Sequence, residues 1–174
     1  MLKLDIGCGG EPNGDVNLDL FLFEDSPHTS QRIDPREIPN FILGDATALP
    51  IRDKAFDEVY CFHVLEHLFH PITCIEEMKR VSRSNVTIKV PNNPVMKEHR
   101  EHLYSWSKSS LSNLVGHFMK VNRIEATSYY LSGKDRKAIR LLNMIPWFQI
   151  KRKMFQLYSS FLGFELIAYC SVIE

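Results

Sequence analysis

The stretch KLDIGCGG, residues 3–10, decides the fold. Leu2, Leu4 and Ile6 alternate with polar residues in the pattern of a short strand, which runs directly into glycines. Glycine has no Cβ, so this kind of turn lets a ligand approach the backbone closely. Asp5 lies near the end of the strand, where open α/β sheets bind ligands. An ordinary glycine turn would look the same, and the rest of the chain separates the two interpretations.

Composition is that of one folded domain. The chain has 174 residues, 44% of them hydrophobic and 24% charged, with a formal net charge of zero. We therefore expect a single domain over 1–174 and no nucleic-acid partner. We find no signal peptide and no apolar run long enough to cross a bilayer, and we expect a cytoplasmic protein. The four cysteines lack the spacing of metal ligands and are expected to be reduced.

Two further apolar segments each end at an aspartate. Residues 16–20 alternate as a second strand that ends at Asp19, and residues 40–45 place Asp45 just past a third strand. A carboxylate at the tip of the second strand can accept hydrogen bonds from both hydroxyls of a ribose. Together with the glycine loop, this pattern favours a nucleoside ligand over a merely solvated Asp19.

The remaining pattern alternates strands with helices. We expect strands over 57–62, 85–90, 121–131 and 164–173, a helix over 71–83 with Ile72, Ile75 and Met78 on its apolar face, and a second helix from Ser107 to Gly116. This alternation predicts a doubly wound, mostly parallel α/β sheet. Right-handed crossovers would bring Gly7, Asp19, Asp45 and Phe62 to one edge of the sheet.

These motifs together resemble a known family. LDIGCGG (4–10), Asp19, GDATALP (44–50) and FDEVYCFHVLEHL (56–68) look like the class I S-adenosylmethionine-dependent methyltransferases, and most like the small-molecule, ubiquinone/menaquinone-type branch with a methyltransferase type 11 domain. The resemblance implies a Rossmann-like αβα sandwich around a seven-stranded sheet whose last strand is antiparallel. It also implies S-adenosyl-L-methionine as the cofactor.

The resemblance implies a role for each matching residue. The amino-acid end of the cofactor would be bordered by Asp5, Gly7, Cys8 and Gly9. The ribose hydroxyls would be held by Asp19, next to Leu20. The adenine amino group would be held by Asp45, next to Ala46. Phe62 and His63 would lie near the sulfonium and the adenosine.

The chain departs from the family in two places. Only about a dozen residues separate Gly7 from Asp19, too few for the usual helix and its turns, so we expect backbone amides of the glycine loop to contact the cofactor. The chain also starts at the first strand, without the helices that roof the site in many members. We therefore expect residues 133–162, between the last two strands, to form an inserted helical cap.

The motif HVLEH, residues 63–67, supplies the candidate catalytic groups. Its histidines have i,i+4 spacing, but the order is not HExxH and no third ligand is evident, so we predict no metal site. His67, followed by His63 and Glu66, is a candidate general base. A base is needed only for a poorly acidic hydroxyl or a protonated amine, since methyl transfer depends mainly on in-line positioning.

Other interpretations receive less support from the sequence. The loop does not fit GxGxxG, because residue 12 is Pro and the acidic residue comes too early, which disfavours NAD or FAD. The basic and aromatic segment 134–153 fits packed helices with a solvated basic face, but also a lid over an anionic acceptor, a peripheral membrane contact or a nucleic-acid contact. A homodimer also stays open.

The sequence therefore predicts a methyltransferase for a small-molecule or a lipid- or sugar-linked acceptor. Two alternatives remain. One is an S-adenosylmethionine-binding regulatory protein with little turnover. The other is an RNA or protein methyltransferase. The lack of an Asn/Asp-Pro-Pro-Tyr motif after the fourth strand argues against the common nucleic-acid enzymes that methylate amino groups.

Overall fold

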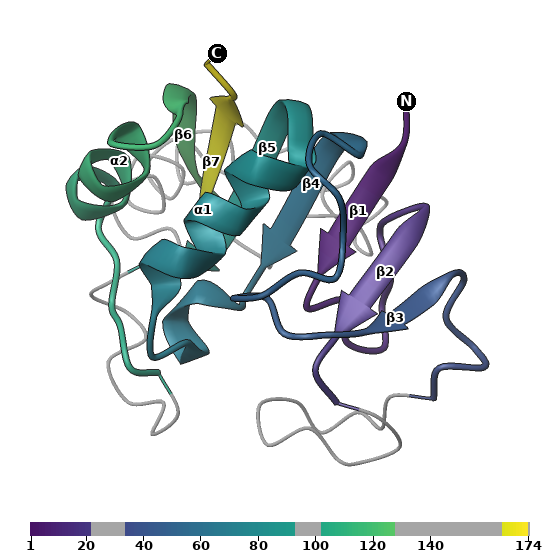
Figure 1. The fold of residues 1–174 in the computed structure, drawn as a ribbon. Coiled ribbons are helices and arrows are strands. Elements are labelled where there is room, and N and C mark those ends of the chain that lie inside the picture. Colours follow the sequence, from purple (N-terminus) through teal and green to yellow (C-terminus); the bar gives the residue numbers. More distant parts are fainter. Residues whose placement is uncertain (22–33, 93–101, 128–164, 174) are drawn as a thin grey trace, which may run out of the picture.

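The structure, a computed structural model, describes residues 1–21, 34–92, 102–127 and 165–173. Seven strands form one sheet in the order β3-β2-β1-β4-β5-β7-β6 (Figure 1). The strands are β1 (Lys3–Ile6), β2 (Val16–Asp19), β3 (Phe41–Leu43), β4 (Phe56–Phe62), β5 (Ser82–Pro91), β6 (Lys120–Thr127) and β7 (Glu165–Ser171). The helices are η1 (Leu65–His67), α1 (Pro71–Val81) and α2 (Lys108–Gly116).

The sheet has the predicted mixture of directions. β3, β2, β1, β4 and β5 are all parallel, while β7 runs antiparallel to both of its neighbours, β5 and β6. The predicted Rossmann-like architecture with an antiparallel last strand is therefore confirmed. The carboxyl ends of β1, β2 and β4 meet at the lower edge of the sheet in Figure 1.

The core is built on the central strands. Leu4, Ile6, Val59 and Ile88 on β1, β4 and β5 are completely buried, and Leu166 on β7 joins the same cluster. Along β4, β5 and β7 these buried residues alternate with partly exposed ones, so they share one face of the sheet and form the core there. The packed sheet is a rigid support for the loops at its carboxyl edge.

Helix α1 crosses in front of β4 and β5 in Figure 1 and buries a face that differs from the prediction. Cys74, Ile75, Met78 and Val81 are buried, whereas Ile72 is 48% exposed. The helix begins at Pro71, which is itself buried. Residues three and four positions further along, Cys74 and Ile75, lie on the same face of the helix, and Ile72 lies off that face. Assigning Ile72 to the apolar face was therefore wrong.

The short helix η1 lies between β4 and α1. Glu66 and His67 belong to this single 3₁₀ turn, and α1 starts at Pro71, where the predicted helix over 71–83 also begins. Helix α2 begins as predicted, since the Ser107 hydroxyl accepts from the Ser110 amide in a capping box. Within the described residues, no helix is long and apolar enough to cross a membrane.

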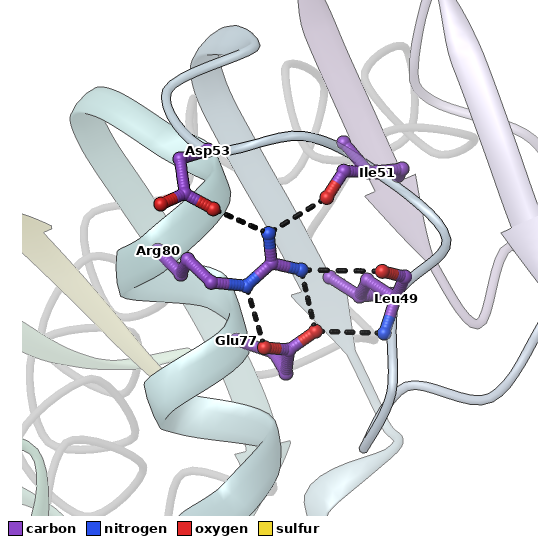
Figure 2. A network of polar contacts seen from close by, with 5 residues as sticks. All are labelled: Leu49, Ile51, Asp53, Glu77 and Arg80. Carbon is purple, nitrogen blue, oxygen red and sulfur yellow. Dashed lines mark hydrogen bonds and ion pairs between the residues drawn. The ribbon is translucent and has the colours of Figure 1, made fainter.

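Arg80 of α1 ties the helix to the loop between β3 and β4 (Figure 2). Its guanidinium donates to both carboxylate oxygens of Glu77 at 2.7 Å, to Asp53 at 2.7 Å, and to the carbonyls of Leu49 (3.2 Å) and Ile51 (2.7 Å). Glu77 in turn accepts from the Leu49 amide at 2.7 Å. Because this loop starts at Gly44 and Asp45, the network fixes one wall of the sheet edge.

The Arg80 network predicts a large difference between two neighbouring arginines. Arg80→Ala should lower the free energy of unfolding by about 2 kcal/mol, because it strips charge-assisted bonds from Glu77 and two loop carbonyls. Arg83 makes one exposed ion pair, with Asp57 at 3.0 Å, so Arg83→Ala should cost less than about 1 kcal/mol. Urea denaturation of both variants measures this, and equal losses would contradict the role given to Arg80.

Candidate functional site: a cavity at the carboxyl edge of the sheet

Two buried carboxylates accept hydrogen bonds from the short link between β1 and β2. Asp5 is 1% exposed and accepts from the backbone amide (2.8 Å) and side-chain amide (3.2 Å) of Asn13. Asp19 is 7% exposed, and its Oδ2 accepts from the Gly9 amide at 2.9 Å. Burial raises the pKa of Asp5 despite the bonds from Asn13. The link between β1 and β2 contains no helix, and its amides at Gly9 and Asn13 donate to these two aspartates.

The glycine loop uses its own amides internally. The amides of Gly7 and Cys8 donate to the Leu18 carbonyl at 2.8 and 3.1 Å, and that of Gly9 donates to Asp19. The expectation that these three amides contact a cofactor therefore does not fit this geometry. The loop contributes its shape, because Gly7 and Gly9 have φ values of +70° and +54°, where side chains are strained.

A cavity of about 440 Å³ opens at this edge, a size typical of small-molecule sites. Four segments line it: the glycine loop, the end of β2 with residues 20–21, the loop 44–47 after β3, and the segment from His63 to His70 after β4. Its walls are mostly apolar, with a few polar groups from separate loops. The sheet edge thus forms one pocket, as the strand-end aspartates predicted.

Asp19 and Asp45, which both line this cavity, use their carboxylate oxygens differently. Asp19 uses Oδ1 to accept from the Phe21 amide at 3.1 Å and Oδ2 for Gly9. Asp45 uses Oδ1 alone, for the amide and hydroxyl of Thr47, both at 2.7 Å, and in the described residues its Oδ2 accepts no hydrogen bond. Each carboxylate oxygen has about two lone-pair sites, so both residues keep acceptor capacity toward the cavity.

The structure brings most of the predicted site residues together. The predicted residues that line the cavity are Gly7, Gly9, Asp19, Leu20, Asp45, Ala46, His63 and His67. The predicted residues outside its lining are Asp5, Cys8, Phe62 and Glu66.

Each of the four residues outside the lining has another environment. Asp5 holds the 7–15 link, and Glu66 is buried in η1. Phe62 stacks on Tyr60 at 5.5 Å between ring centroids, since residues two apart on a strand share a face. Burial raises the pKa of Cys8 to about 12, so its thiol stays protonated at neutral pH.

His63 lies between two carboxylates in a left-handed backbone conformation, with φ at 56°. Its Nε2 is 3.0 Å from Glu165 on β7, and its Nδ1 is 3.4 Å from Glu66. Burial opposes a charge here, but the contacts with Glu165 and Glu66 outweigh it and raise the pKa of His63 to about 9. At neutral pH His63 is therefore a cation, which does not suit the predicted role of a proton acceptor.

Sequence reasoning missed several groups that shape the site. Val64 packs so close to Gly7 that a Cβ at residue 7 would clash with the Cγ2 of Val64. Glu165 comes from β7, more than one hundred residues after His63, and also pairs with Lys89 at 3.8 Å. Glu165 reaches His63 because the antiparallel pairing puts it opposite Pro91 at the end of β5, and no local pattern in the sequence encodes that pairing.

Comparisons with known proteins identify the family of this domain. Residues 4–88 match the family described as "Methyltransferase domain". This region belongs to the class I S-adenosylmethionine-dependent methyltransferases. The matched residues include the glycine loop, Asp19, Asp45 and the HVLEH motif. The predicted family is therefore confirmed.

One curated relative shares part of this domain. It is a demethylmenaquinone methyltransferase from Renibacterium salmoninarum, 35% identical over 79 residues. That match covers 44% of this chain and 33% of the relative, so the chain corresponds to about a third of the relative's length.

Solved structures of methyltransferases share the fold of this chain. A SAM-dependent methyltransferase from Thermotoga maritima has a TM-score of 0.67 at 11% identity, covering 99% of this chain and 82% of that one. Another from Archaeoglobus fulgidus has a TM-score of 0.63 at 17% identity, covering 97% and 85%. At such identities the likeness establishes the fold alone.

The two strained glycines of the methyltransferase loop predict unequal costs. Gly7→Ala should destabilise by about 2–4 kcal/mol, from left-handed strain plus the clash with Val64. Gly9→Ala meets nothing within 4 Å, so it should cost only about 1–2 kcal/mol. Thermal or urea unfolding gives both values. The double variant Gly7→Ala/Val64→Ala should recover part of the loss, and failure to do so would remove Val64 from the explanation.

The His63 pair predicts a defined pH dependence. The folded state raises the pKa of His63 from 6.5 to about 9. The contribution of protonated His63 to the free energy of unfolding is therefore fully present below pH 6.5 and is lost as the pH rises through 9. The stability difference between wild type and Glu165→Gln should therefore shrink over that window. Glu125→Gln, which breaks an exposed pair with Arg123, is the control. Imidazole NMR titration checks the site directly, and a His63 midpoint near 6.5 in the wild type would contradict the pairing.

Proposed function

We propose that the cavity binds S-adenosyl-L-methionine and that the protein transfers its methyl group to a small-molecule acceptor. The observation that carries this proposal is the Asp19 carboxylate, almost buried at the tip of β2 and opening into the cavity next to the left-handed glycine loop. Such a carboxylate suits the two hydroxyls of a ribose. The methyltransferase family match over residues 4–88 supports the same ligand.

The residues present fit that cofactor. Asp19 would hold the ribose hydroxyls, and Oδ2 of Asp45 would accept from the adenine amino group, next to Ala46. Gly7 leaves room that a Cβ would fill, since Val64 closes the wall there. When bound, the cofactor supplies an electrophilic methyl group, and this chain's contribution is to orient it, exclude water and position the acceptor.

The acceptor end of the cavity favours an apolar molecule. Leu20 and Phe69 line the cavity yet are 57% and 79% exposed, so they offer apolar surface at its opening. The curated relative is named for a quinone-type acceptor, and an acceptor with an apolar ring or chain suits these side chains. A lipid-linked acceptor fits this reasoning better than a sugar-linked one.

Several predictions from the sequence concern features that the described residues do not test. The cap over 133–162 and the basic segment 134–153 lie outside the described residues. A single domain over 1–174, a peripheral membrane contact, a homodimer and a cytoplasmic location likewise stay proposals. The acceptor pocket can be tested without them, because its described walls come from β1, β2, β3 and β4.

Cofactor affinity tests the role of Asp19. In calorimetry with S-adenosylhomocysteine, Asp19→Asn should weaken binding by about 10- to 100-fold, the range expected for one charge-assisted hydrogen-bonding group. Asp57→Asn is the matched control, because Asp57 binds the Leu2 amide and Arg83 away from the cavity. Equal affinities of wild type and Asp19→Asn would contradict the proposed ribose contact.

Turnover separates the enzyme from the regulatory alternative. Incubation with methyl-labelled cofactor and a panel of hydroxylated quinols, phenols and amines should transfer label to at least one class. Cofactor binding without transfer to any acceptor would favour the regulatory protein. No cofactor binding at all would overturn both proposals.

A further inference from the structure

Glu66 is a buried carboxylate of η1 to which no hydrogen-bond donor is aligned among the described residues. Its side chain is 1% exposed, and neither carboxylate oxygen accepts a hydrogen bond in the described part of the chain. Burying an ionised carboxylate without donors or a compensating charge is costly. Glu66 therefore lowers the stability of the fold relative to an apolar side chain at the same position.

His63 satisfies Glu66 only in part. Nδ1 of His63 is 3.4 Å from Oε1, within ion-pair distance but without the alignment of a hydrogen bond. The other ring nitrogen is directed to Glu165, at 3.0 Å. The His63 ring is thus shared between two carboxylates, and the lone pairs of Glu66 stay open to a further ligand.

Two other imidazoles lie next to Glu66. The rings of His67 and His102 meet edge to face, with centroids 4.9 Å apart. One ligand atom from each of Glu66, His67 and His102 falls within a group in which every pair is within 4.8 Å. The three side chains therefore converge on a common point, although His102 is far from the other two in the sequence.

Backbone hydrogen bonds hold His102 in that place. The amides of Leu103 and Tyr104 both donate to the carbonyl of Glu66, at 2.8 and 3.3 Å. The Tyr104 hydroxyl also donates to the Phe69 carbonyl at 3.1 Å. The segment after His102 is thus fastened to η1, which makes the convergence of the three side chains a feature of the fold.

We propose that Glu66, His67 and His102 bind a divalent transition-metal ion, with zinc as the type case. One carboxylate and two neutral imidazoles form a common protein ligand set for zinc and its neighbours in the first row. Metal–ligand bonds of about 2.0–2.2 Å place ligand atoms at most about 4.4 Å apart. The two imidazole rings must therefore turn slightly inward on binding, and any protons on their ligand nitrogens are released.

The ion would lie at the wall of the cavity, because His67 lines the cavity while Glu66 is buried behind it. Three protein ligands leave a coordination position for water or an acceptor oxygen, and a metal there would favour a deprotonated hydroxyl. This consequence for the acceptor rests on the proposed function. Metal binding itself does not.

Calorimetry with ZnCl₂ on the metal-stripped full chain, without cofactor, tests the site. The wild type should bind one equivalent, and Glu66→Gln and His102→Ala should each weaken binding by roughly 100-fold or more, as expected for loss of a direct ligand. Glu165→Gln is the matched control for charge near His63, and His117→Ala, at the C-cap of α2, is the control for loss of a histidine. Both controls should bind like the wild type.

Substitution with Co²⁺ identifies the donors. The visible spectrum should show nitrogen and oxygen ligation without a thiolate charge-transfer band, since the four cysteines are buried and play no part in the site. Circular dichroism establishes that each variant is folded. The proposal is overturned if the wild type binds no zinc, if binding persists unchanged in Glu66→Gln and His102→Ala, or if Glu165→Gln loses it equally.

Discussion

The site depends on how the chain turns from β1 into β2 without a helix. Residues 7–15 cover this distance with two aspartates as internal acceptors: Asp5 takes the amide of Asn13, and Asp19 takes that of Gly9. A buried amide without a partner costs about as much as a lost hydrogen bond. The two carboxylates remove this cost for Asn13 and Gly9, and the Leu18 carbonyl accepts from the Gly7 amide, so the loop keeps its left-handed glycines and stays narrow beside the cavity.

The other walls are fixed from outside the cavity. Arg80 and Glu77 on α1 clamp the loop that follows Asp45, and the pairing of β5 with β7 brings Glu165 to His63. Each wall is thus anchored to a helix or a strand and depends little on the other walls. An arrangement of this kind lets a rigid sheet edge carry a pocket whose loops come from distant parts of the chain.

Local patterns in the sequence were enough to predict a doubly wound, mostly parallel sheet and its strand-end residues, while the seven strands and the antiparallel last strand were implied by the family resemblance. Alternation before Gly7, before Asp19 and before Gly44 fixed three strand ends, and their parallel pairing brought Asp19 and Asp45 to one cavity. The register of α1 was harder, because Ile72 looked apolar but the helix start at Pro71 turned it to solvent.

The long-range contacts of the site could not be predicted from the sequence, for a physical reason. Glu165 and His102 reach the HVLEH motif through strand pairing and backbone hydrogen bonds across large separations, which no periodicity encodes. The absence of a third metal ligand near His63 and His67 suggested no metal site. In the folded chain, however, His102 lies next to Glu66 and His67.

A crystal structure of the protein with S-adenosylhomocysteine tests the central claim most directly, since that claim is about where one ligand lies. The account predicts the ribose hydroxyls on the Asp19 carboxylate and the adenine beside Asp45 and Ala46, with the glycine loop unchanged around Gly7. A ligand bound elsewhere, or a ribose that makes no contact with Asp19 inside this cavity, would contradict it.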